Sequence, residues 1–205
     1  MKQMKCWMLA AILTVSGTSG LTSCGNKGKG TDKHGQLLEV YDVKGSEATA
    51  RLTIDGTEVF TTSVYIGKNG IGKTGEGDSK TPTGTLHVAK AFGVKANPGT
   101  TIPYIDVTPS IFACDEECEY YNQVIDTTKT HHPCKGEDMF HTVPAYNYGL
   151  TTDFNADCNW PDGSNIFIHC KGQKTYTGGC IAFDEDKMVE ILRRCDTSLE
   201  VVVSE

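Results

Sequence analysis

A histidine and a cysteine that lie close together in the sequence could perform nucleophilic catalysis. His169 ends the strand-like segment 165–169, and Cys180 follows Gly178 and Gly179. A histidine can take the proton of a nearby thiol and so generate the thiolate, which is the nucleophile. The glycines allow a sharp turn, in which the N–H groups of Gly179 and Cys180 could stabilise an oxyanion. The segment could therefore carry out acyl transfer through a cysteine; the alternative is that both side chains are packing residues.

Two cysteines compete for the role of nucleophile. Successive side chains of a strand point to opposite faces, so Cys170 should point away from His169. Cys180 also shortly precedes a predicted helix that starts at Asp184, and the helix dipole would favour a thiolate. We therefore predict Cys180 as the nucleophile and His169 as its general base.

The elements that must position these residues are mostly β-strands. An Asp55-Gly56 turn signal separates residues 48–54 from residues 57–66, which predicts a hairpin. Further strands are predicted over residues 37–43, 86–92, 102–107, 121–125, 148–154, 165–170 and 199–203. One helix is predicted after Asp184, because apolar residues recur at helical spacing at Met188, Ile191, Leu192 and Cys195. We expect a mainly β domain, a β-sandwich or mixed sheets, with one C-terminal helix packed near Cys180.

The N-terminus has the pattern of an exported protein. Lys2 and Lys5 precede an apolar run over residues 6–15, which is too short to span a membrane and indicates a secretory signal. The run ends in Leu-Thr-Ser-Cys at residues 21–24, which resembles the lipobox of bacterial lipoproteins. The resemblance implies a signal peptide over residues 1–23 and a lipid on Cys24, which would anchor the protein to a membrane. The alternative is an ordinary signal peptide with a chance cysteine.

The segment after Cys24 predicts where the domain would act. We predict that residues 24–35 form a flexible tether, because residues 25–35 include no apolar side chain. Those 11 residues reach at most roughly 36 Å. A domain on such a tether lies in the layer beside the membrane, which in a bacterial envelope is peptidoglycan. By analogy with lipoproteins, Gly25 in place of an acidic residue favours the periplasmic side of the outer membrane.

Length and charge suit one acidic domain. Residues 1–23 hold two of the 19 basic residues and no acidic residue, so their removal leaves 182 residues with a net charge of −9. We assign residues 36–205 to a single domain. The negative charge argues against a nucleic-acid partner.

Several cysteines lie outside the segment that could perform catalysis. Disulfides among Cys114, Cys118, Cys134 and Cys158 are one interpretation for an exported protein, with a connectivity that sequence does not give. The alternative is a zinc site built from Cys114, Cys118 and Cys134 with His131 or His132. We favour disulfides and predict no metal site.

Four separate segments resemble one family of enzymes. The segment from His169 to Thr-Gly-Gly-Cys-Ile at residues 177–181 is similar to the signature of L,D-transpeptidases of the YkuD type. Residues 64–70 and 75–84 resemble the strand and the Thr-Pro-x-Gly turn of that family, and residues 146–150 resemble the strand before its histidine. The match extends over about residues 59–192, in the right order.

The resemblance implies a role for each matched residue. It makes Cys180 the nucleophile, His169 the base, and the N–H groups of Gly179 and Cys180 the oxyanion hole. It assigns substrate contacts to Thr177 and Gly178. The sequence departs from the family at Gly178, where a histidine is usual, and at Ala182, where an arginine or asparagine is usual. Outside the signature, Tyr148 and Trp160 are candidates for contacts with a glycan or stem peptide, with packing as the alternative.

The implied reaction is transpeptidation of peptidoglycan. Cys180 would form a thioester with a stem peptide and pass it to an amine acceptor, giving a 3–3 cross-link, without a metal or organic cofactor. Two alternatives stay open. Water could resolve the thioester, which would make the protein an L,D-carboxypeptidase. The domain could also bind peptidoglycan without chemistry, which the departures at Gly178 and Ala182 would favour.

Overall fold

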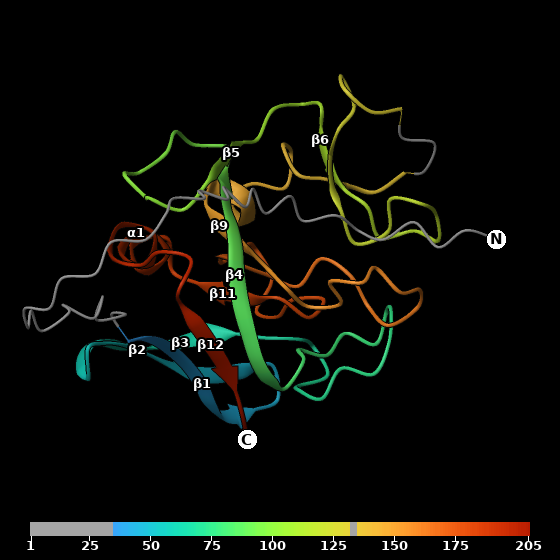
Figure 1. The fold of residues 1–205 in the computed structure, drawn as a ribbon. Helices are drawn as coiled ribbons and strands as arrows, with labels where there is room; N and C mark the ends of the chain where they lie inside the picture. The colour runs from blue at the N-terminus through green and yellow to red at the C-terminus, as the bar shows by residue number, and fades with distance from the viewer. Residues whose placement is uncertain (1–34, 132–134) are drawn as a thin grey trace, which may run out of the picture.

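The main body of the protein is a sheet that closes on itself. The structure is a computed structural model that describes residues 35–131 and 135–205. Its strands are β1 (Gln36–Lys44), β2 (Glu47–Ile54), β3 (Thr57–Tyr65), β4 (Gly84–Gly93), β5 (Tyr104–Asp106), β9 (Gly149–Thr152), β10 (Phe167–Cys170), β11 (Ile181–Phe183) and β12 (Glu200–Val203). Their order is β12-β1-β2-β3-β11-β10-β9-β4-β5, and β12 also pairs with β4. This second pairing joins the two ends of the sheet, so the strands from β12 to β4 form a barrel (Figure 1).

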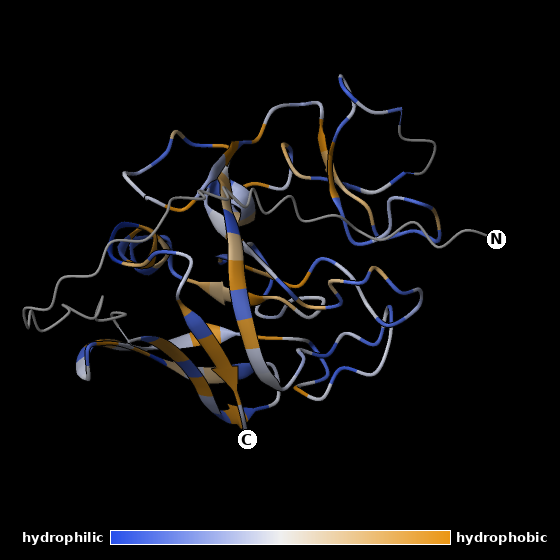
Figure 2. Cartoon of the chain, viewed as in Figure 1, coloured by the Kyte–Doolittle hydropathy of each residue, from blue (hydrophilic) through white to orange (hydrophobic). Residues whose placement is uncertain are grey.

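The barrel forms because its strands alternate apolar and polar side chains. Buried and part-exposed residues alternate along β1 and β2, as the two colours along these strands show in Figure 2. Leu38, Val40, Ala50 and Leu52 are fully buried in the barrel. The predicted mainly β fold with mixed sheets and a C-terminal helix is confirmed, and the sheet closes into a barrel.

A smaller sheet lies in the segment between β5 and β9, at one end of the barrel (Figure 1). It consists of β6 (Ile111–Ala113), β7 (Val124–Asp126) and β8 (Glu137–Asp138), in the order β7-β6-β8. A short 3-10 turn, η1 (Ala145–Asn147), then leads into β9. The rings of Phe92, Tyr146 and Phe167 pack edge to face, with centroids 5.3 to 6.0 Å apart, and connect this segment to the barrel.

The helix α1 (Glu185–Arg194) follows β11 and packs on the barrel core. Its apolar residues Met188, Ile191 and Leu192 are fully buried, as their spacing predicted. Asp184 occupies the N-cap position, but its side chain makes no cap hydrogen bond. Instead it accepts from Lys171 Nζ at 3.0 Å, which ties the helix start to the loop after β10.

Several predicted strands have different bounds. The strand predicted over residues 121–125 is replaced by β7, which starts three residues later. Residues 121 and 122 form a turn instead, in which Tyr121 is buried and its hydroxyl donates to Glu76. The predicted strands 102–107 and 148–154 shrink to β5 and β9. The short strands β6, β8 and β11 were not predicted.

Some predictions fall outside the described residues. These are the signal peptide 1–23, the lipid on Cys24 and all of the tether except Gly35. His132, a candidate zinc ligand, and Cys134, a candidate for a disulfide or the zinc site, also lie outside the described residues. Gly35 is described, and its N–H donates to Asp55 Oδ1 at 3.0 Å. In the part of the chain that the structure describes, no helix is long and apolar enough to cross a membrane.

The loop between β3 and β4 is organised by one carboxylate. Asp78 accepts hydrogen bonds from Lys73 Nζ at 2.9 Å and from the N–H groups of Thr74, Gly75 and Lys80. The Lys73 side chain is only 2% exposed. Burial alone would raise the pKa of Asp78, but these donors outweigh it and lower the pKa to about 2.

We expect Asp78→Asn to lower the free energy of unfolding by about 2 to 4 kcal/mol at neutral pH, because it leaves the Lys73 ammonium buried without its partner. The carboxylate stabilises the fold above its unfolded pKa of 3.8, and this contribution is lost as the pH falls through about 2. Urea denaturation of wild type and variant at several pH values measures both effects. Asp42→Asn is the control, since that carboxylate forms an exposed ion pair with Lys44. Equal stability of wild type and Asp78→Asn at neutral pH would contradict the expectation.

Candidate active site

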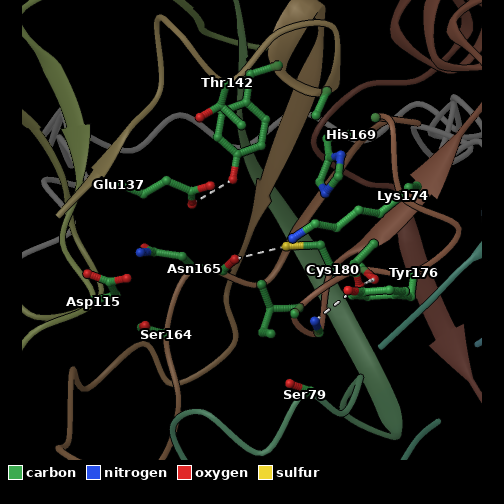
Figure 3. Close-up of a pocket in the computed structure, with 18 of the residues that line it drawn as sticks. Ser79, Asp115, Glu137, Thr142, Ser164, Asn165, His169, Lys174, Tyr176 and Cys180 are labelled. Carbon is green, nitrogen blue, oxygen red and sulfur yellow. Dashed lines mark hydrogen bonds between the residues drawn. The ribbon is translucent and has the colours of Figure 1, made fainter. Parts of the chain in front are cut away.

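One cavity of about 470 Å³ brings together the residues that could perform chemistry. Cys180 stands in the turn before β11, and His169 lies on β10, the parallel neighbour of β11. Both side chains line the cavity, and Figure 3 shows the imidazole of His169 directed toward the side chain of Cys180. Cys170 does not line it, because its side chain is 2% exposed and packs in the barrel core, as strand alternation requires.

His169 is held as a neutral ring with a free acceptor nitrogen. Its Nδ1 lies 2.7 Å from the carbonyl oxygen of Cys170, and a carbonyl only accepts, so Nδ1 carries the hydrogen. The other nitrogen, Nε2, therefore has the lone pair that a base needs. The ring also packs edge to face on Tyr146. Burial lowers the pKa of His169 to about 4.

Cys180 is a thiol held by two backbone groups. Its Sγ donates to the Asn165 carbonyl at 3.2 Å, drawn as a dashed line in Figure 3, and accepts from the Phe167 N–H at 3.3 Å. Burial raises the pKa of Cys180 to about 12. The net shift of this pKa is therefore opposite in direction to the lowering that we expected from the helix dipole. The strand β11 separates Cys180 from the start of α1, and the dipole acts only near the first turn.

The turn from Thr177 to Cys180 depends on Thr177. Its hydroxyl donates to the Cys180 carbonyl at 2.7 Å and accepts from the Gly179 N–H at 3.1 Å. Thr177 also lines the cavity, but its hydroxyl is committed to the turn. The Gly179 N–H would have to leave Thr177 Oγ1 before it could bind a substrate oxyanion.

The two glycines of this turn have different roles. Gly179 has φ +148°, and a Cβ there would lie 2.7 Å from the carbonyl oxygen of Lys80. Gly178 lines the cavity, and a Cβ there would meet nothing within 4 Å. The position where the family usually has histidine is therefore open space in this protein. Ala182, the second departure, is buried at the cavity wall beside His169 in the β10–β11 pairing.

We expect Gly179→Ala to lower the free energy of unfolding by more than about 1 kcal/mol and to reduce activity at least about tenfold, because the turn cannot accommodate a side chain there. Gly178→Ala is the matched control. It should unfold with a free energy close to that of wild type and keep an activity within about twofold of wild type. Thermal unfolding and the rate of Cys180 acylation measure the two effects. A Gly179→Ala variant as stable and active as Gly178→Ala would show that the turn tolerates a side chain at both positions.

Tyr148 and Trp160 do not line the cavity. The Tyr148 ring packs against the barrel and lies 5.9 Å from Lys95 Nζ. Trp160 is 42% exposed and packs edge to face on Tyr121. The aromatic residue at the cavity is instead Tyr146, two residues earlier, because η1 turns its ring toward His169. The structure therefore favours the packing interpretation for Tyr148 and Trp160.

The opposite wall of the cavity is acidic, and sequence analysis assigned none of it to the site. It carries Asp115 and Glu137, with Asn165 between them and Cys180 (Figure 3), and Glu76 also lines the cavity. These residues gave no signal in the sequence, because folding brings them to the cavity from separate segments of the chain.

The cysteines of the small sheet take part in at least one disulfide. Cys118 is disulfide-bonded, which agrees with the interpretation that we favoured. Cys114 is a buried thiol whose Sγ lies 3.4 Å from Cys118 Sγ. Among the described residues, no group of three or more His, Cys, Asp or Glu side chains is arranged to hold a metal ion.

A comparison with models of protein families identifies the family of this chain. The profile described as YkuD, L,D-transpeptidase catalytic domain, matches residues 39–203. The chain therefore belongs to the YkuD family of L,D-transpeptidase catalytic domains, whose members act on peptidoglycan stem peptides in the cell envelope outside the cytoplasm. A search among curated proteins found no match.

Solved structures of low sequence identity are similar to this chain. One is the helical cell shape determining protein Pgp2 (K307A mutant) from Campylobacter jejuni, with 17% identity and a TM-score of 0.46 over 85% of this chain and 48% of that one. Another is the Ldtfm-avibactam carbamoyl enzyme, with 14% identity and a TM-score of 0.42 over 83% of this chain and 49% of that one. A third is an L,D-transpeptidase from Mycobacterium smegmatis, with 13% identity and a TM-score of 0.39 over 83% of this chain and 58% of that one. The chain spans about half the length of these proteins.

Proposed function

We propose that this protein is an active, cysteine-dependent L,D-transpeptidase. The observation that carries the proposal is that Cys180 and His169 face one cavity while a backbone carbonyl holds His169 with Nε2 as the acceptor. Family membership gives the substrate class, which is the peptidoglycan stem peptide. The departures at Gly178 and Ala182 leave both reacting side chains in place.

The first half of the reaction forms a thioester. Cys180 Sγ turns from the Asn165 carbonyl toward His169, whose Nε2 takes its proton. The thiolate attacks the carbonyl carbon of the L,D-peptide bond between the third and fourth stem residues. The oxyanion is stabilised by the Cys180 N–H and by the Gly179 N–H once it is released from Thr177. The imidazolium of His169 then protonates the leaving amine, which departs with the fourth residue.

The second half transfers the acyl group. The side-chain amine of another stem attacks the thioester, His169 takes a proton from that nitrogen, and the proton passes to the departing Cys180 sulfur. The product is a 3–3 cross-link and the resting thiol. Protons are conserved across the cycle, and the steps need no oxidant or metal.

We place this reaction in the cell envelope, next to a membrane. The lipobox-like Leu-Thr-Ser-Cys at residues 21–24 supports a lipid on Cys24, and the apolar-free residues 25–35 support a tether from it. A lipid-anchored position on the periplasmic side of the outer membrane follows from the same N-terminal pattern. Mass spectrometry of the mature N-terminus would test the lipid.

The product of wild-type protein with purified tetrapeptide muropeptides tests the function. We expect cross-linked dimers and released fourth residue by mass spectrometry, and a carbapenem adduct on the peptide that contains Cys180. Release of the fourth residue without dimers would indicate the L,D-carboxypeptidase. The absence of both products and adduct would reject an enzyme and favour a domain that only binds peptidoglycan.

A further inference from the structure

The cavity has a second polar wall that the mechanism above does not use. Glu76 comes from the loop between β3 and β4, Asp115 follows β6, and Glu137 lies in β8. Ala113 of β6 pairs with Glu137 of β8, and this register brings the carboxylates of Asp115 and Glu137 to the same side of the cavity. Figure 3 shows both facing the cavity across from His169 and Cys180.

Asn165 lies between this wall and the nucleophile and lacks hydrogen-bond partners for its side chain. It is only 8% exposed, yet neither its Nδ2 nor its Oδ1 has a partner among the described residues. Figure 3 shows the amide extending toward Asp115 and Glu137. The backbone of Asn165 is fixed, because its N–H donates to Asn122 Oδ1 and its carbonyl accepts from Cys180 Sγ. Buried polar groups without partners are rare in proteins and costly, so a ligand is expected to complete this one.

The wall presents acceptors that are still open. Glu76 Oε2 accepts from the hydroxyls of Tyr121 and Ser164, and Glu137 Oε2 accepts from Tyr146. Within the described residues, no side chain is bound to the Asp115 carboxylate, which accepts from its own backbone N–H, and Glu137 Oε1 has no partner. Two lysines also line the cavity. Lys73 is bound to Asp78, and Figure 3 shows Lys174 on the opposite side, with its side chain extending toward Cys180.

The carboxylates also repel one another. Burial raises the pKa of Glu137, and the charge of Asp115 raises it further. Burial likewise raises the pKa of Asp115, to which the charges of Glu76 and Glu116 add. A cation bound between them would relieve this repulsion.

We propose that Asp115, Glu137 and Asn165 form a subsite that binds the primary ammonium group of the acceptor stem peptide beside Cys180. An ammonium has three N–H donors, which match the open oxygens of the two carboxylates and Asn165 Oδ1. Before transfer, the bound ammonium passes one proton to one of these carboxylates, which later releases it to solvent. This leaves the neutral amine that attacks the thioester. Asn165 Nδ2 then donates to a carbonyl or carboxylate oxygen of the same stem. The subsite rests on the proposed function, and it restricts the acceptor to stems whose third residue carries a free side-chain amine.

Binding of a stem tripeptide to the wild-type mature protein tests the subsite. A tripeptide has no fourth residue to release, so it binds as an acceptor without reacting. Isothermal titration calorimetry would compare a tripeptide with a free side-chain amine and the same tripeptide acetylated on that amine. We expect acetylation to weaken binding about tenfold or more, because it removes the charge-assisted hydrogen bonds.

Isosteric variants locate the effect. Asp115→Asn and Glu137→Gln should each weaken binding of the free amine about tenfold while changing binding of the acetylated tripeptide less than twofold. Glu117→Gln is the matched control in the same acidic loop and should bind both as wild type does. Equal affinity for the two tripeptides, or an equal loss for both in the variants, would overturn the subsite. The muropeptide assay reports thioester chemistry separately, so failure of the enzyme function is distinguishable from failure of this subsite.

Discussion

Cys180→Ala is expected to abolish thioester formation, with a loss of at least about 10³-fold in the rate of product formation. The mechanism has one covalent intermediate on the protein, the thioester, and Cys180 Sγ is the atom that attacks the substrate carbonyl to form it. The thiol proton is donated to the Asn165 carbonyl in the resting structure, so the variant loses this contact and the one to Phe167 N–H. Mass spectrometry of muropeptides and of carbapenem-treated protein measures the loss.

The matched control for this prediction is Cys170→Ala. Cys170 stands next to His169 on β10, but its side chain packs in the barrel core, where its Sγ lies 3.5 Å from the Tyr148 carbonyl. Its removal should lower stability by about 1 to 2 kcal/mol through lost packing and leave the rate within a few-fold. A Cys180→Ala variant that still forms dimers, or a Cys170→Ala variant that does not, would refute the choice of nucleophile.

Sequence patterns predicted the long strands of the barrel because those strands alternate apolar and polar side chains. Residues 37–43 and 48–54 alternate apolar and polar side chains, and β1 and β2 have that pattern of burial. The same rule separated Cys170 from His169. Three-residue strands such as β6 and β11 have no such pattern, and they exist because long-range partners pair with them.

The acidic wall could not be predicted, because its residues meet only after folding. Asp115 and Glu137 are neighbours through the pairing of β6 with β8, and Glu76 comes from a loop before β4. Asn165 was read as the start of a strand. Its φ of +51° is a left-handed conformation, which puts it outside β10 and is not encoded in any periodic pattern.

The electrostatics of the nucleophile were also mispredicted. The chain order places Cys180 shortly before the helix, which suggested help from its dipole. Burial in the cavity dominates instead and raises the pKa of the thiol, while it lowers the pKa of His169. The resting pair is therefore a neutral thiol and a neutral imidazole, and His169 must act as a true general base during the attack.

This resting state makes His169→Ala the second change with a large expected effect. We expect the acylation rate to fall about 10² to 10⁴-fold at neutral pH, because the variant loses the neutral imidazole that faces the thiol. His141→Ala is the control, since His141 is exposed and paired with Asp138 away from the cavity. A loss of less than tenfold in His169→Ala would mean that another group or solvent serves as the base.

The pH dependence of acylation distinguishes a base from a packing residue at position 169. In wild type, His169 is neutral and able to accept above its pKa of about 4, so the rate should be level from weakly acidic to basic pH and fall as the pH drops toward about 4. In His169→Ala the thiolate arises only by ionisation of Cys180, whose pKa is raised to about 12. The rate of the variant should therefore rise about tenfold per pH unit through the neutral and basic range and approach wild type only at high pH. Carbapenem acylation followed by mass spectrometry between pH 5 and pH 10, roughly the range between the two pKa values, gives both profiles. Parallel profiles with a constant ratio would show that His169 supports the fold of the site but does not accept the proton.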